Sequence, residues 1–179
     1  MRLLKIIGLA ILGIIVLALI VAGIADKEYA VSREITINAP HQEVFDYVKY
    51  LKNQDEFSKW ATMDPDMRNT FTGVDGTVGF IAAWESENDD VGVGEQEILS
   101  IDKNRIDYAL RFKEPFESND KAYLKLEAVG DNQTKVTWGF NGSMDYPMNL
   151  MLVVMDFDEM LGTDLQYGLE ELKRIMESR

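Results

Sequence analysis

The last stretch of the chain, residues 147–177, carries apolar side chains at steps of three and four. These side chains are Leu150, Val154, Phe157, Leu161, Leu165, Leu172 and Ile175. This spacing places them on one stripe of an α-helix. It predicts a single helix from Pro147 to Glu177. Gly168 lies on the stripe, where its missing side chain lets another backbone come close. Pro147 suits a helix start because its missing N–H would be unpaired there. A helix of this length cannot bury its stripe alone, so other parts of the chain must cover it.

Most of the preceding chain alternates apolar and polar residues, as strands with one buried face do. The turns between these segments have hairpin lengths, which favours one antiparallel sheet. Two short amphipathic helices are expected at residues 41–51 and 53–60. We therefore expect an α+β fold in which a curved sheet wraps the terminal helix and the short helices close one end. The expected strands cover residues 29–37, 68–72, 78–85, 92–101, 105–112, 121–129 and 133–141.

The amino-terminal stretch contains no charged residue between Ile6 and Ala25. About 20 apolar residues match the hydrocarbon thickness of a bilayer, so residues 3–25 are predicted to span a membrane and residues 1–25 to form an anchor. Because Arg2 and Lys5 precede the stretch, the positive-inside tendency places the amino terminus in the cytoplasm and the domain, residues 26–179, outside it. A cleaved signal peptide and a core helix are the alternatives, although a signal peptide has a shorter apolar core.

Charge and residue types exclude several classes of site. The chain has no cysteine, which excludes disulfides, thiolate catalysis and thiolate metal sites. Its formal charge of −13 opposes binding to nucleic acid, which requires a basic face. His41 is the only histidine, and one histidine cannot build a metal site. No cofactor and no nucleic-acid partner are therefore predicted, and no oligomeric state follows from the sequence.

Several short segments together are typical of a known family. They are residues 35–40, 43–48, 134–138, 161–162 and 168–173, together with Trp60. On these segments the chain resembles the START-like (SRPBCC) superfamily of helix-grip proteins, and within it the polyketide cyclase/dehydrase and lipid-transport group. The resemblance covers nearly everything from Tyr29 onward. It implies a deep cavity between the sheet and the terminal helix, usually holding an apolar ligand, and it brings no shared catalytic motif.

Aromatic residues on the expected strands and methionines on the expected helix are the candidates for the lining of that cavity. Such pockets are mostly apolar with a few placed polar groups, and methionine adapts to varied ligands. The alternative is that these residues form ordinary core, where aromatics are also common. The predicted ligand-binding residues are Phe80, Trp84, Tyr108, Phe112, Trp138, Phe140, Met151, Met155 and Asp158.

Carboxylates close to the apolar stripe are the candidates for chemistry. Asp158 and Asp164 fall at its two edges, and Glu95 and Glu97 share one strand face. A carboxylate facing a dry cavity would have a raised pKa and could transfer protons or hold a polar group of a ligand. The alternative is that these side chains reach solvent.

Three hypotheses for function follow. The first is binding or transport of a hydrophobic, lipid-like small molecule, with no reaction catalysed. The second is a cyclase- or dehydratase-type enzyme that uses an inward Asp, Glu or Tyr108 to move a proton. The third is a partner-binding domain whose cavity is filled by its own side chains. An open cavity favours the first, a desolvated carboxylate in that cavity favours the second, and a packed interior favours the third.

Overall fold

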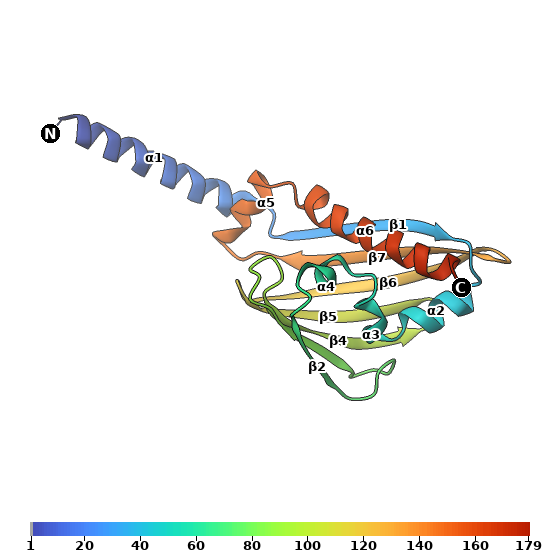
Figure 1. Cartoon of the computed structure of the whole chain (residues 1–179). Coiled ribbons are helices and arrows are strands. Elements are labelled where there is room, and N and C mark those ends of the chain that lie inside the picture. The colour runs from blue at the N-terminus through green and yellow to red at the C-terminus, as the bar shows by residue number, and fades with distance from the viewer. Residues whose placement is uncertain (1) are drawn as a thin grey trace.

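The computed structural model of the protein describes residues 2–179. One long helix precedes a seven-stranded sheet and a group of carboxy-terminal helices (Figure 1). The elements are α1 (Arg2–Ile24), β1 (Glu28–Ile37), α2 (His41–Val48), α3 (Leu51–Gln54), α4 (Lys59–Met63), β2 (Arg68–Thr72), β3 (Ile81–Glu85), β4 (Val93–Asp102), β5 (Arg105–Glu114), β6 (Ser118–Gly130), β7 (Gln133–Ser143), η1 (Met148–Leu150), α5 (Met151–Val154) and α6 (Phe157–Glu177).

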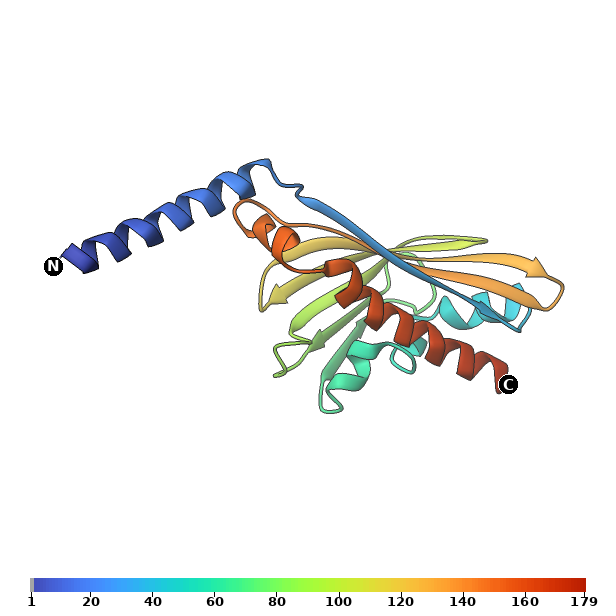
Figure 2. The same cartoon turned by 90° about the horizontal axis from the view of Figure 1, so that it is seen from above.

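The sheet has the strand order β1-β7-β6-β5-β4-β3-β2, and all neighbouring strands are antiparallel. Only the β1–β7 pair joins strands that are distant in sequence. The sheet curves, and α6 crosses its concave side close to β1 (Figure 2). The α+β helix-grip architecture expected from the sequence is therefore confirmed.

The inner surface of α6 explains how the helix fits the sheet. Leu165, Leu169 and Leu172 are fully buried against the core. Gly168 faces the sheet directly: a Cβ at this position would lie 2.6 Å from Cζ3 of Trp138 and 3.2 Å from the carbonyl oxygen of Phe57. The glycine on the apolar stripe thus permits close packing of the helix, as its position in the sequence indicates.

The prediction of one continuous helix from Pro147 to Glu177 is wrong. The segment forms a 3₁₀ helix, η1, that continues directly into α5, and then a separate helix, α6, because Met155 adopts an extended backbone between α5 and α6. Asp156 then caps α6, with its carboxylate accepting a hydrogen bond from the backbone N–H of Glu159 at 2.9 Å. An aspartate at this position favours a helix start. The apolar period of three and four continues across this break and conceals it.

Other boundaries also differ from the sequence prediction. The chain between β1 and β2 contains three short helices rather than two, with breaks after Val48 and Gln54. The third strand begins at Ile81 rather than Val78 because Gly79 has a positive φ. The strand β6 begins at Ser118, three residues earlier than predicted. This last difference matters for the functional site.

The helix α1 extends away from the sheet, at the end of the molecule opposite to the carboxy terminus (Figures 1 and 2). Among residues 2–179 it is the single helix long and apolar enough to cross a membrane. Its carboxy-terminal end is held by Asn149, a fully buried residue whose Nδ2 donates to the carbonyl oxygens of Ala22 and Ala25 at 2.7 and 3.2 Å. The side chain thereby pairs carbonyls that the helix end leaves free.

Candidate functional site

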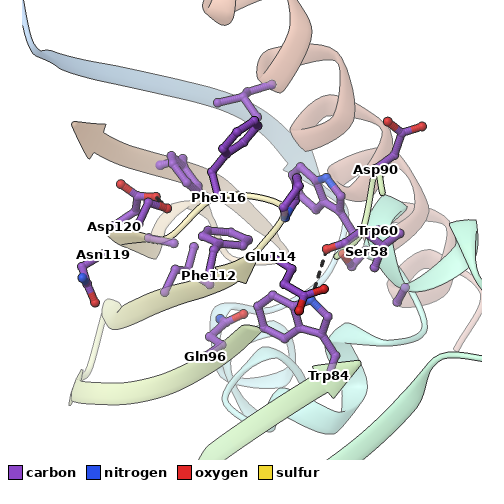
Figure 3. A pocket seen from close by; sticks show the side chains of 18 of the residues that line it. Ser58, Trp60, Trp84, Asp90, Gln96, Phe112, Glu114, Phe116, Asn119 and Asp120 are labelled. Atoms are coloured by element: carbon purple, nitrogen blue, oxygen red, sulfur yellow. Dashed lines mark hydrogen bonds between the residues drawn. The ribbon is translucent and has the colours of Figure 1, made fainter. Parts of the chain in front are cut away.

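A cavity of about 790 Å³ lies between the concave face of the sheet and the start of α6. Its walls come from residues of all seven strands, from the short helices α3, α4, η1 and α5, from the start of α6 and from loops such as the one between β5 and β6. Phe116 and Met148 line the cavity and are also exposed, so the cavity opens to solvent near the junction with α1. Figure 3 shows side chains from these elements converging on the space.

Aromatic side chains form a large part of the hydrophobic wall. Trp84 and Phe112 meet edge to face with ring centroids 5.7 Å apart, and Trp60 meets Trp138 in the same way at 6.4 Å. Such edge-to-face pairs are favoured by the aromatic quadrupole. The indole N–H of Trp84 donates to the carbonyl oxygen of Val91 at 3.3 Å, which satisfies its polar atom within the wall (Figure 3). The wall can therefore receive apolar groups without leaving this donor unpaired.

The structure brings together five of the nine residues predicted to bind ligand. They are Trp84, Phe112, Trp138, Phe140 and Met151, and all of them line the cavity.

The other four predicted residues lie elsewhere. Phe80 and Tyr108 are buried in the core away from the cavity, and Met155 is partly exposed in the turn before α6. The Tyr108 hydroxyl has no hydrogen-bond partner among the described residues, and burial raises its pKa. Asp158 lies outside the cavity, where its carboxylate binds Arg33. Because Arg33 donates to it, the pKa of Asp158 is lowered rather than raised.

The remaining candidate carboxylates also lie outside the cavity. Glu95 and Glu97 project from the outer face of β4, where both bind the guanidinium of Arg111 from β5. Asp164 is half-buried on α6, and its burial raises its pKa, partly opposed by Lys59. None of these three carboxylates is among the cavity-lining residues.

A carboxylate that the sequence analysis missed lies inside the cavity. Asp120 on β6 is 5% exposed; it accepts hydrogen bonds from the Ser118 hydroxyl at 2.8 Å and from the Ser143 backbone N–H at 3.3 Å. Burial raises the pKa of Asp120, while these two hydrogen bonds lower it to a smaller degree. Side chains alternate between the two faces of a strand, so Asp120 shares the inner face with Ala122 and Leu124. The predicted strand begins at Lys121 and therefore does not include Asp120.

Two glutamine side chains supply neutral polar groups to the cavity wall. Gln54 of α3 and Gln96 of β4 exchange hydrogen bonds at 3.4 and 3.2 Å, and both residues line the cavity. Gln96 is almost fully buried. An amide group retains acceptor and donor positions beyond this pair, so a ligand hydroxyl or carbonyl could bind there. The cavity thus combines large apolar walls with a few fixed polar groups, the usual composition of a small-molecule site.

Comparison with known structures places this architecture among proteins of one fold. A protein from Nitrosospira multiformis has a TM-score of 0.56 and 18% identity, covering 83% of this chain and 96% of that one. The structure of Ara h 8.0201 has a TM-score of 0.57 and 15% identity, covering 85% of this chain and 99% of that one. The di-domain ARO/CYC StfQ from the steffimycin biosynthetic pathway has a TM-score of 0.65 and 7% identity, covering 86% of this chain and 52% of that one.

At sequence identities this low, the structural similarity shows a shared fold alone. No curated protein sequence matches the chain. The family model described as polyketide cyclase / dehydrase and lipid transport matches residues 29–177, which is nearly the whole chain after α1. The match therefore includes the sheet, the cavity and α6. The chain belongs to the polyketide cyclase/dehydrase and lipid transport family.

Proposed function

We propose that the protein binds a hydrophobic small molecule in the cavity between the sheet and α6, and holds or carries it without changing it. The observation that supports this most is the open cavity of about 790 Å³ with aromatic and methionine walls. Its volume lies in the range of roughly 300–1,000 Å³ usual for small-molecule sites. Contact with residues such as Trp84, Phe112, Trp138, Phe140 and Met151 supplies most of the affinity, because each buried methylene contributes about 0.8 kcal/mol.

We further propose that α1 anchors the protein in a membrane, with its amino terminus in the cytoplasm and the binding domain, residues 26–179, outside. The helix has the length and composition for this role. The cavity opening lies near the junction with α1: Met148 and Met151 line the cavity on either side of Asn149, which binds the end of α1. Val153 and Val154 of α5 are exposed in the same region. A ligand dissolved in the bilayer would reach the cavity by a short path.

A homologous series of ligands tests the binding function. All three tryptophans of the chain line the cavity, so their fluorescence reports on its occupancy. Primary alcohols of increasing chain length are titrated into the full-length protein in a non-ionic detergent. Affinity should rise by about fourfold per methylene, the equivalent of about 0.8 kcal/mol, until the cavity is full.

The matched controls place the same substitution on opposite faces of the sheet. Ala122 of β6 lines the cavity, whereas Ala109 of β5 is on the outer face. Ala122→Phe should reduce the cavity volume and shorten the alcohol length at which affinity stops rising, while Ala109→Phe should leave that length unchanged. Unchanged tryptophan fluorescence of the wild-type protein with every alcohol, and no apolar ligand found by native mass spectrometry, would rule the proposal out.

A second candidate function is an enzyme of the cyclase or dehydratase type. One observation favours it: Asp120 is a desolvated carboxylate inside the cavity with a raised pKa, and a carboxyl group in such a place can act as a general acid or base. Tyr108, which the sequence suggested for this role, is buried away from the cavity. With a polyketide-like substrate, Asp120→Asn would abolish turnover and retain binding if this candidate were correct. The open cavity gives no support to the third hypothesis, a domain with a filled interior.

A further inference from the structure

The ionisable side chains that line the cavity all carry the same sign of charge. Within residues 2–179, none of the lining residues is Lys, Arg or His. Six of the seven acidic residues are exposed and one, Asp120, is buried. A cleft lined by one sign of charge, with low-dielectric walls, concentrates ligands of the opposite sign. The seven residues are Asp55, Asp89, Asp90, Glu114, Glu117, Asp120 and Asp145.

The basic side chains near the cavity are held on the outside of its walls. Arg111 follows the inward Leu110 on β5 and points to the outer face, where it binds Glu95 and Glu97. On the short helices, Lys59 lies over the ring of Tyr167 at 5.0 Å from its centroid. The negative charge of the cavity therefore has no balancing positive charge within the lining.

Asp120 is the innermost of these acids and has no cationic partner. None of the ion pairs among the described residues includes it. Its two hydrogen bonds come from a hydroxyl and a backbone N–H, which leaves acceptor positions on both carboxylate oxygens. A carboxylate that is buried without a positive partner is destabilised by desolvation. An arriving cation would remove this cost.

One aromatic ring lies close to Asp120 and packs against two others in the cavity wall. Tyr29 lines the cavity close to Asp120, whose charge adds to burial in raising the pKa of the Tyr29 hydroxyl. The Tyr29 ring stacks on Phe140 with centroids 6.0 Å apart and meets Phe157 at 5.3 Å, and both phenylalanines also line the cavity. Aromatic faces beside a carboxylate are the arrangement that recognises ammonium groups through cation–π attraction and charge.

We propose that the ligand of this cavity is a hydrophobic molecule with a positively charged nitrogen, and that Asp120 and the ring of Tyr29 receive that nitrogen. The inference rests on the proposed binding function and adds the chemical class of the ligand. The apolar part of the molecule lies against the tryptophans and Phe112. A fatty acid of the same length is disfavoured, because its carboxylate would be brought next to Asp120.

Three probes of equal chain length test this proposal: decyltrimethylammonium, decanol and decanoate. Each is titrated below its micellar concentration into the full-length protein in one non-ionic detergent, with tryptophan fluorescence as the readout. Monomeric diheptanoyl-phosphatidylcholine is a fourth probe, which separates recognition of a lipid headgroup from recognition of a simple ammonium. The wild-type protein should prefer decyltrimethylammonium over decanoate by about tenfold or more, which corresponds to the strength of a desolvated cation–π and ionic contact.

Variants test whether Asp120 and Tyr29 cause the preference for decyltrimethylammonium over decanoate. Asp120→Asn keeps the acceptor for the Ser143 N–H but removes the charge, and should reduce the ratio of the two affinities to near one. Tyr29→Leu, which removes the ring and keeps the carboxylate, should reduce it partly. Asp131→Asn, an equal change of charge in the turn between β6 and β7, should leave the ratio unchanged. The partitioning of each probe into micelles is the same for every variant in one detergent, so it cancels when the ratio of a variant is compared with that of the wild-type protein.

The possible results separate this inference from the proposed function. Equal affinity of the wild-type protein for decyltrimethylammonium, decanol and decanoate would overturn the inference and leave the binding function intact. A preference for the ammonium that survives in a folded Asp120→Asn variant would also overturn it. Binding of none of the probes would remove the proposed function itself. Strong binding of the phospholipid together with decyltrimethylammonium, lost for both in Asp120→Asn, would identify a lipid headgroup as a source of the ammonium. Binding of the phospholipid without decyltrimethylammonium would overturn the inference.

Discussion

The guanidinium of Arg33 binds the carboxylate of Asp158, joining two residues that are 125 positions apart in the sequence. Nη2 of Arg33 lies 2.9 Å from Oδ2 of Asp158 and 2.7 Å from the backbone carbonyl oxygen of Asp158. The contact connects the edge strand β1 to the first turn of α6, and it runs past Gly162, whose missing side chain leaves room for the guanidinium. It therefore fixes the first turn of α6 against the sheet on the outside of the cavity.

Substitution of Asp158 by asparagine should have a small effect on stability and none on ligand binding. The Asp158 side chain is 66% exposed, and exposed ion pairs contribute little because water and salt screen them. The pKa of Asp158 is lowered by Arg33, so this contribution is present at neutral pH and is lost as pH falls through the lowered value. Thermal unfolding at low and high salt is the measurement. A loss of probe binding in Asp158→Asn would contradict the position of this residue outside the cavity.

Substitution of Gly168 by alanine should destabilise the protein. The added Cβ would lie 2.6 Å from the ring of Trp138, a distance at which either the helix or the ring must move. Overpacking of this kind costs roughly 1–3 kcal/mol. Gly130→Ala is the matched control, because its Cβ would meet only the Gln133 side chain, at 3.8 Å or more. Urea unfolding of both variants, followed by tryptophan fluorescence, measures the difference, and equal stability of the two would contradict the close contact of α6 with Trp138.

The sequence reveals the fold more readily than the site, for a physical reason. Alternation along the strands and the period of three and four along α6 arise from burial of whole faces, and many residues repeat the same signal. The break at Met155 depends on one cap, Asp156, within an unbroken apolar period. Whether Asp120 is recognised as an inward-facing residue depends on where one strand, β6, begins. Features set by one residue are therefore the ones that periodicity does not resolve, and the polar part of the cavity is set by such residues.

Substitution of Asn149 by alanine should loosen the junction between α1 and the domain. Its Nδ2 donates to the carbonyl oxygens of Ala22 and Ala25, and loss of the side chain leaves these buried or partly buried acceptors without a partner. Lys27 lies two residues after Ala25 in the chain. Its backbone carbonyl oxygen accepts a hydrogen bond from the N–H of Met144 at 2.8 Å. Trypsin should therefore cleave after Lys27 faster in Asn149→Ala than in the wild-type protein. Asn132→Ala, in the turn between β6 and β7, is the control and should show the wild-type rate.

The raised pKa of Asp120 predicts how stability and ligand affinity change with pH. The folded state holds the proton of the Asp120 carboxyl group more tightly than the unfolded state does. The contribution of Asp120 to the free energy of unfolding therefore falls as pH rises from the ordinary carboxyl pKa through the raised pKa. Asp120→Asn removes this dependence, so the variant should gain stability relative to the wild-type protein as pH increases across that window. Affinity for decyltrimethylammonium should change in the opposite direction and strengthen over the same window, since only the ionised carboxylate attracts the cation.

Urea unfolding and probe titration at a series of pH values from acidic to neutral measure both effects in one set of samples. Asp131→Asn is the control, because Asp131 is an exposed acid in the turn between β6 and β7, outside the cavity. Its removal should leave both pH dependences in place, since solvent and salt screen an exposed charge. If stability of Asp120→Asn relative to the wild-type protein were independent of pH, the desolvation of Asp120 would be refuted. An affinity for the ammonium probe that stayed constant over the window would assign its binding to the aromatic walls alone.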